Sequence, residues 1–252
     1  MNYEPAYRIF SSGDSAITLD FGNLIDESIN RRVMALFKLL QNHPLPGMTE
    51  AVPAYSSITI YYDVAQLRKK IAHDKTINEW MEEELRKKLQ QPLQVDDVSS
   101  RTITVPVCYD KEFALDIEEI TSIKNISVNE LIQIHTSKVY RVYMLGFLPG
   151  FAYMGEVNEK LETPRKQQPR QKVEAGSVGI AGKQTGIYPF SSPGGWQIIG
   201  RTPLKLFDTN KKEPNLLKAG DDVKFISITI DDFYKIQNSP SPFMESGQGG
   251  EV

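Results

Sequence analysis

The chain has 252 residues, of which 29 are Lys or Arg and 32 are Asp or Glu, and 40 % of it is hydrophobic. This is the composition of a folded globular protein, and the formal charge of −3 offers no electrostatic footprint for nucleic acid or an anionic membrane. One cysteine excludes an intramolecular disulfide, and with only three histidines it argues against a zinc site. The start lacks the pattern of a secretory signal and no apolar run approaches the about 18 residues that span a bilayer, so we expect a cytoplasmic protein.

Residues 1–95 carry the patterns of a small α+β domain. Short strands are predicted over 6–11, 15–21, 48–55 and 56–63. A first helix begins at an Asp26 N-cap, and a second helical stretch begins at Val64, in which Thr76 and Glu79 form a capping box. The order ββαββα predicts two helices on one face of a mostly antiparallel sheet.

The second helical stretch of this domain has one buried and one solvated face. Its buried stripe is predicted to consist of Ile77, Trp80, Met81, Leu85 and Leu89. On the opposite face, acidic residues precede basic ones by four positions, which favours ion pairs in water. These pairs are Glu82–Arg86, Glu83–Lys87 and Glu84–Lys88.

The segment 92–100 is polar and rich in turn residues, and we interpret it as a domain boundary. A second domain is then predicted over 96–238, followed by a flexible, low-complexity tail over 239–252. A strand over 101–109 is followed by two short helices that start at Asp116 and Ser127. From there, short β runs alternate with Gly and Pro, which predicts a β-barrel or sandwich. These runs are 139–145, 173–182, 195–200, 204–208 and 222–230.

Several motifs invite a catalytic interpretation that their context does not support. The run 182–185 (GKQT) resembles a phosphate loop but lacks both the earlier glycine and a following helix. Ser177 resembles a hydrolase nucleophile but is flanked by strand on both sides. Cys108 has no basic neighbour to activate it and is interpreted as a structural thiol. His135 is a weak catalytic candidate, since most lone histidines in such positions are capping or core residues.

The segment 146–202 is the strongest candidate for a binding groove. It crowds aromatic, arginine and small residues onto irregular segments of a β scaffold, where aromatics can form walls and arginine can bind a carboxylate or phosphate. The predicted substrate-binding residues are Arg165, Arg170, Gln184, Tyr188, Trp196, Arg201 and Thr202. The alternative is a loop packed on the barrel with solvated arginines.

Three stretches resemble a known family: SGDSAITLDFG near the start, YRVYMLGFLPGFAYMG, and the long run from Thr163 to Asp208. Together they are similar to the KipI family, also described as PxpB, the B subunit of 5-oxoprolinase, and as allophanate hydrolase subunit 1, over residues 7–236. The resemblance implies an N-terminal α+β domain and a C-terminal cyclophilin-like β-barrel. It does not imply prolyl isomerase activity, because a fold alone does not carry chemistry.

The resemblance implies a non-autonomous enzyme subunit. It would take part in the ATP-dependent conversion of 5-oxoproline to L-glutamate with a second cyclophilin-like subunit (PxpC or KipA type) and PxpA, with ATP held at the level of the complex and no metal site in this chain. The alternative is inhibition of a sporulation sensor histidine kinase by binding its dimerisation and phosphotransfer domain. The predicted partner-binding residues are Phe147, Phe151 and Tyr153, on a loop expected to be exposed.

Overall fold

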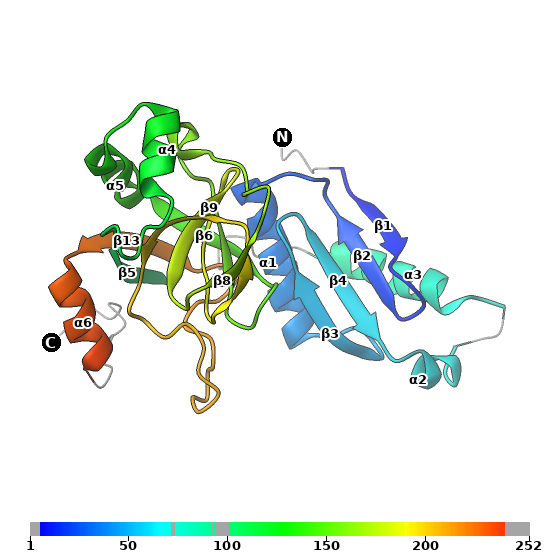
Figure 1. Cartoon of the computed structure of the whole chain (residues 1–252). Coiled ribbons are helices and arrows are strands. Elements are labelled where there is room, and N and C mark those ends of the chain that lie inside the picture. Colours follow the sequence, from blue (N-terminus) through cyan, green and yellow to red (C-terminus); the bar gives the residue numbers. More distant parts are fainter. Residues whose placement is uncertain (1–5, 72–73, 92, 94–100, 240–252) are drawn as a thin grey trace, which may run out of the picture. The chain divides into compact units, whose positions relative to one another are not determined.

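The computed structural model describes residues 6–71, 74–91, 93 and 101–239. The chain divides into two compact units, Met1–Ser99 and Ser100–Val252, and each is described by itself (Figure 1). The predicted boundary over 92–100 lies outside the described residues except for Leu93, and the predicted tail over 239–252 lies outside them except for Ser239. No helix in the described ranges is long and apolar enough to cross a membrane.

The N-terminal unit is built on a four-stranded antiparallel sheet in the order β1-β2-β4-β3. The strands are β1 (Arg8–Ser11), β2 (Ala16–Asp20), β3 (Met48–Pro53) and β4 (Ser57–Tyr62). In the register of the two central strands, Ile17 lies opposite Ile60 and Leu19 opposite Ile58. These four side chains alternate with more polar ones and are all buried, so one face of the sheet is the core face.

Helices cover that face of the sheet (Figure 1). They are α1 (Glu27–Asn42), against β3 and β4, and α3 (Ile77–Leu89), against β1 and β2. The helical stretch predicted from Val64 is two helices, because the short α2 (Val64–Arg68), which contacts α3, ends before the capping box at Thr76. The carboxylate of Asp26 accepts a hydrogen bond from the backbone N–H of Ile29 at 2.9 Å, which confirms the predicted N-cap. The helices contribute Val33, Leu36, Leu40, Met81 and Leu85 to the core.

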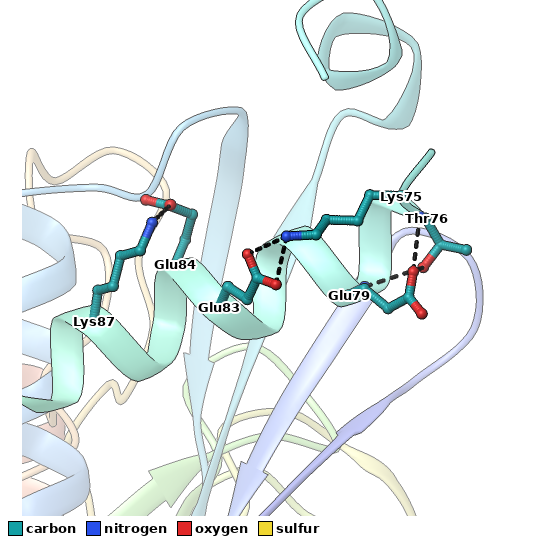
Figure 2. A network of polar contacts seen from close by, with 6 residues as sticks. All are labelled: Lys75, Thr76, Glu79, Glu83, Glu84 and Lys87. Atoms are coloured by element: carbon teal, nitrogen blue, oxygen red, sulfur yellow. Dashed lines mark hydrogen bonds and ion pairs between the residues drawn. The ribbon is translucent and has the colours of Figure 1, made fainter. Parts of the chain in front are cut away.

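Helix α3 begins with the predicted capping box (Figure 2). Thr76 Oγ1 accepts from the backbone N–H of Glu79 at 3.2 Å, and Glu79 Oε2 accepts from the backbone N–H of Thr76 at 2.9 Å. Of the three ion pairs predicted for this helix, only that of Glu82 forms. The partners predicted for Glu83 and Glu84 are wrong, because Glu83 pairs with Lys75, which precedes the helix, and Glu84 pairs with Lys87, three residues later. The pairs are Arg86–Glu82 at 2.6 Å, Lys75–Glu83 at 2.6 Å and Lys87–Glu84 at 2.7 Å.

The C-terminal unit is a closed seven-stranded barrel with the strand order β10-β7-β6-β13-β5-β12-β9. The barrel agrees with the prediction for this half of the chain. Strand β13 runs parallel to β5, and the other pairs are antiparallel. The strands are β5 (Thr102–Cys108), β6 (Val139–Leu145), β7 (Ala152–Gly155), β9 (Ser177–Ala181), β10 (Gln184–Ile187), β12 (Gln197–Arg201) and β13 (Asp222–Ile228).

Helices pack outside the barrel, with α4 (Ile117–Lys124) on β12, α5 (Val128–Ser137) on β13 and α6 (Ile230–Asn238) on β5 (Figure 1). A short helix η1 (Glu159–Leu161) and a separate two-stranded sheet of β8 (Arg170–Val173) and β11 (Ser192–Gly194) complete the described part of the unit. The strand predicted over 204–208 is wrong. Its backbone forms an isolated bridge from Phe207 to Asn215, in which the carbonyl of Leu206 accepts from the N–H of Leu216 and the N–H of Asp208 donates to the carbonyl of Pro214. The segment therefore bonds to its own loop and not to a barrel strand.

The capping box gives the first prediction. Thr76→Ala removes the hydroxyl that accepts from the backbone N–H of Glu79 and donates to the Glu79 carboxylate. The variant should destabilise the first turn of α3 by about 1 kcal/mol, which raises its opening equilibrium constant about fivefold. Hydrogen exchange of the peptide spanning 77–89 measures this. The matched control is Lys87→Ala at an exposed ion pair, which should change exchange little. Equal exchange in both variants would show that the box does not hold the helix end.

Candidate functional site

An aromatic cluster occupies one side of the barrel, where β7, β9, β10 and β12 neighbour each other. Phe151 lies edge-on to Tyr188 and to Trp196, with ring centroids 5.2 and 5.3 Å apart. Gly186 makes this packing possible, because a Cβ there would lie 2.9 Å from Trp196 and 3.1 Å from Phe151. Tyr153 also contacts the cluster, with its ring centroid 4.8 Å from that of Phe151.

The aromatic residues predicted to contact a substrate or a partner differ in how far they are buried. The exposure expected of Phe151 is wrong: it is 1 % exposed, because its ring fills the centre of the cluster. Tyr188 and Trp196 are also buried, so they support the surface from beneath more than they line it. Phe147 is 61 % exposed and has a φ of +65°, in the left-handed region that few non-glycine residues adopt. Tyr153 is half-buried.

Arg165 lies above this cluster. Its guanidinium carbon is 5.9 Å from the centroid of the Trp196 ring, within the range of a cation–π contact. The side chain is exposed, and no carboxylate in the described ranges forms an ion pair with it. A positioned guanidinium without an acidic partner is suited to binding an anion.

The loop that carries Arg165 is anchored on the buried carboxylate of Asp116. Arg170 donates two hydrogen bonds to it, at 2.6 and 2.9 Å, as a bidentate pair. Lys166 Nζ lies 2.9 Å from Oδ1, and the backbone N–H of Ile198 donates to Oδ2 at 2.6 Å. Hydrogen bonds to Asp116 and Glu119 raise the pKa of Lys166. The carboxylate is 1 % exposed, so its charge is balanced entirely by these neighbours.

The contacts of Asp116 confirm one sequence-based prediction and conflict with another. Asp116 does start helix α4, but its side chain makes no capping hydrogen bond, because both of its oxygens face Arg170, Lys166 and Ile198. The guanidinium of Arg170 is consequently committed to Asp116, which conflicts with its predicted role in holding a substrate carboxylate. Sequence reasoning missed this anchor because the helix-start signal already accounted for the aspartate.

A pocket of about 550 Å³ opens beside the anchored loop, within the usual size range of small-molecule sites. It lies between helix α4 and the loop that follows η1. Of the predicted substrate-binding residues, only Arg165 lines it. The lining residues are Glu119, Ile123, Lys124, Glu162, Thr163, Pro164, Arg165, Lys166, Gln167, Gln168 and Gln197.

Other predicted site residues lie elsewhere in the barrel. Arg201 donates from Nε to the carbonyl of Ala175 at 2.7 Å and lies over the ring of Phe113, at 5.8 Å. Thr202 is buried, and its hydroxyl accepts from the backbone N–H of Leu204 at 3.3 Å. Gln184 opens β10, in a hairpin with β9. None of these three residues lines the pocket, and their assignment to substrate binding stays a prediction.

The hairpin of β9 and β10 argues against both a phosphate loop and a nucleophile elbow. The turn after Ala181 joins β9 directly to β10, so the run 182–185 lacks the helix that a phosphate loop requires. Ser177 is buried at the start of β9 and is followed by strand, as expected, so it is no nucleophile elbow. Among the described residues, no group of three His, Cys, Asp or Glu side chains could hold a metal ion.

His135 is fully buried and its tautomer follows from its partners. Thr185 donates its hydroxyl proton to the carbonyl of Gly179 at 3.1 Å, so it accepts from His135 Nε2 at 3.2 Å. Nδ1 is then the acceptor for the hydroxyl of Tyr109 at 2.7 Å. Burial lowers the pKa of His135 from 6.5 to about 3 and raises that of Tyr109 well above its ordinary value. A neutral, enclosed imidazole with both nitrogens occupied is a core histidine.

The comparisons with known proteins agree with this architecture. A family model described as "Carboxyltransferase domain, subdomain C and D" matches residues 7–217. The 5-oxoprolinase B subunit of Bacillus subtilis (strain 168) is 42 % identical over 90 % of this chain and 95 % of its own length. The 5-oxoprolinase B subunit of Escherichia coli O157:H7 is 35 % identical over 87 % of this chain and 95 % of its own length.

Among solved structures, the crystal structure of TTHA0988 is 36 % identical with a TM-score of 0.71 and covers 84 % of this chain. This chain spans 40 % of the TTHA0988 chain. The chain belongs to the carboxyltransferase C and D subdomain family and, within it, to the family of 5-oxoprolinase B subunits.

The anchor gives the second prediction. Asp116→Asn leaves the partly buried charge of Arg170 without a counter-ion, while Lys166 keeps its ion pair with Glu119, and should lower the free energy of unfolding of the barrel by about 3 kcal/mol. Urea unfolding followed by Trp196 fluorescence, in a Trp80→Phe background, measures it. The control is Glu174→Gln at the exposed pair with Lys172, with an effect within about 0.5 kcal/mol. A loss below about 1 kcal/mol for Asp116→Asn would contradict the anchoring role.

The buried histidine gives the third prediction. Below pH 6.5 His135 binds a proton in the unfolded chain but stays neutral in the native state. The stability that comes from burying the neutral ring is therefore complete above pH 6.5 and is lost as the pH falls toward 3. The ring NMR signals of His135, assigned with a His135→Gln variant, should therefore stay constant from about pH 8 to about pH 5. A titration midpoint near 6.5 would show that the ring reaches water and would revive its catalytic candidacy.

Proposed function

We propose that this chain is a non-autonomous subunit of an ATP-dependent 5-oxoprolinase, which converts 5-oxoproline to L-glutamate. The observation that carries the proposal is the close similarity, over nearly the full length of both proteins, to the 5-oxoprolinase B subunits of two bacteria. A pocket of ligand size, lined by an arginine that has no ion-pair partner among the described residues, supports a role in holding an anionic substrate.

The reaction adds one water across the lactam C–N bond. The hydroxyl goes to the carbonyl carbon, the proton goes to the nitrogen, and the ring opens to the amino acid. An amide is resonance-stabilised, so activation by ATP makes the opening practicable. The described residues of this chain do not fit a phosphate loop, and we assign the nucleotide to another subunit of the complex and derive no step through it here.

Within this complex, Arg165 holds the carboxylate of 5-oxoproline. Its guanidinium is fixed over Trp196, which lowers the conformational freedom lost on binding. Arg170 and Lys166 act indirectly, by holding the loop on Asp116. Phe147 is exposed beside the aromatic cluster and is the contact that we assign to the second cyclophilin-like subunit, because aromatic side chains dominate protein interfaces.

The fourth prediction tests the proposal with the purified chain alone and with the second cyclophilin-like subunit and PxpA. Glutamate release from 5-oxoproline should require ATP and the full set. Arg165→Gln should raise KM for 5-oxoproline about tenfold, the effect of losing a charge-assisted hydrogen bond. Lys235→Gln on α6, an exposed cation outside the pocket, is the control and should leave KM unchanged.

Rapid ATP-dependent turnover by this chain alone would contradict the subunit role, and no turnover by the full set would remove the oxoprolinase proposal. Inhibition of a sensor histidine kinase, the alternative that the family resemblance offers, would then be the function to test. Binding to a purified phosphotransfer domain would be the assay, with Phe147→Ala as the variant.

A further inference from the structure

One side chain in the pocket beside α4 has an unsatisfied hydrogen-bonding group. Gln197 is 6 % exposed and lines the pocket from strand β12. Its Nε2 donates to the carbonyl of Pro164 at 3.1 Å, which fixes the orientation of the amide, since a carbonyl can only accept. Oε1 is then an acceptor, and no donor among the described residues lies within hydrogen-bond distance of it.

A buried acceptor without a donor is costly, and few are found in native proteins. The cost is removed when a ligand supplies an N–H or O–H group. Oε1 itself has almost no accessible surface, so a ligand in the pocket reaches it only when the Gln197 amide or its neighbours shift, and a ligand that supplies a donor there gains this hydrogen bond.

The charges around the pocket define the rest of the ligand. Glu119 is paired with Lys166 at 2.9 Å, and Glu162 lies 3.9 Å from Lys183. Lys124 and Arg165 also line the pocket, and neither forms an ion pair with any residue in the part of the chain that the structure describes. The lining contains three basic side chains, those of Lys124, Arg165 and Lys166, and two acidic ones, those of Glu119 and Glu162, so basic groups are in excess. Their positive charge favours an anionic ligand.

We infer that this pocket binds a small carboxylic acid that carries an amide N–H, with the N–H donating to Gln197 Oε1 and the carboxylate held by Lys124 and Arg165. The inference rests on the proposed function in one respect: 5-oxoproline has a lactam N–H and a carboxylate in one small molecule. Gln197 is then the residue that distinguishes a lactam from a lactone, and Lys124 and Arg165 are those that require the acid.

The test is calorimetric titration of the full chain with four ligands that differ in one group each. They are 5-oxoproline, its N-methyl derivative, the corresponding lactone acid, and 2-pyrrolidinone, which lacks the carboxylate. The wild-type chain should bind 5-oxoproline at least about tenfold more tightly than the N-methyl and lactone acids, because these leave Oε1 without a donor. It should bind 2-pyrrolidinone more weakly by a similar factor.

Variants separate the two parts of the inference. Gln197→Leu should bind the lactam and lactone acids equally, whatever its overall affinity, so a change in loop stability does not obscure the result. Lys124→Gln should weaken binding of 5-oxoproline about tenfold and leave 2-pyrrolidinone unaffected. The control is Lys235→Gln, whose side chain lies outside the pocket.

No binding of 5-oxoproline up to about 10 mM, or equal binding of lactam and lactone by the wild-type chain, would overturn the inference. A complex that turns over 5-oxoproline while the Gln197→Leu variant keeps its lactam preference would place the substrate elsewhere and leave the proposed function standing. Selective amide-acid binding here, with no turnover by the full set of subunits, would refute the proposed function and leave the pocket assignment intact.

Discussion

The buried charge of Asp116 is the constraint on which the candidate site depends. A carboxylate removed from water must find its counter-charges and donors within the protein, and here they come from the loop over 164–170 and from strand β12. The backbone N–H of Asp116 also donates to the carbonyl of Ile198 at 2.8 Å, so α4 and β12 are joined twice. These contacts hold an irregular loop in one conformation on a rigid barrel, and that loop forms one wall of the pocket.

Three consecutive residues of the barrel wall link this anchor to the binding surface. Trp196 lies beneath the guanidinium of Arg165, Gln197 faces the pocket, and Ile198 donates its N–H to Asp116. Because these three residues follow each other in the chain, the hydrogen bond from Ile198 to Asp116 also fixes the positions of Gln197 and of the Trp196 ring beneath Arg165. This geometry gives the proposed subunit a preformed surface, which lowers the cost of ordering side chains when a ligand binds.

Local patterns predicted much of the fold. Alternation gave the strands of the N-terminal sheet to within a few residues, and side-chain caps at Asp26 and Thr76 gave the starts of α1 and α3. The short Gly-separated β runs predicted a barrel, though its closure and the parallel pairing of β5 with β13 depend on residues about 120 positions apart, which periodicity cannot reveal. The candidate site was harder to predict for the same reason. Arg165 was predicted from its loop, whereas Gln197 and Asp116 gain their significance only from neighbours distant in sequence. The pairing of Arg170 with Asp116 likewise joins residues 54 positions apart.

The most direct test of this account is a crystal structure of the chain, in complex with its partner subunits, grown with 5-oxoproline. The account predicts ligand density in the pocket between α4 and the 162–168 loop, with the lactam nitrogen within hydrogen-bond distance of Gln197 Oε1 and the carboxylate on Arg165 and Lys124. Density for 5-oxoproline at another place in the complex, with this pocket filled only by water, would contradict it.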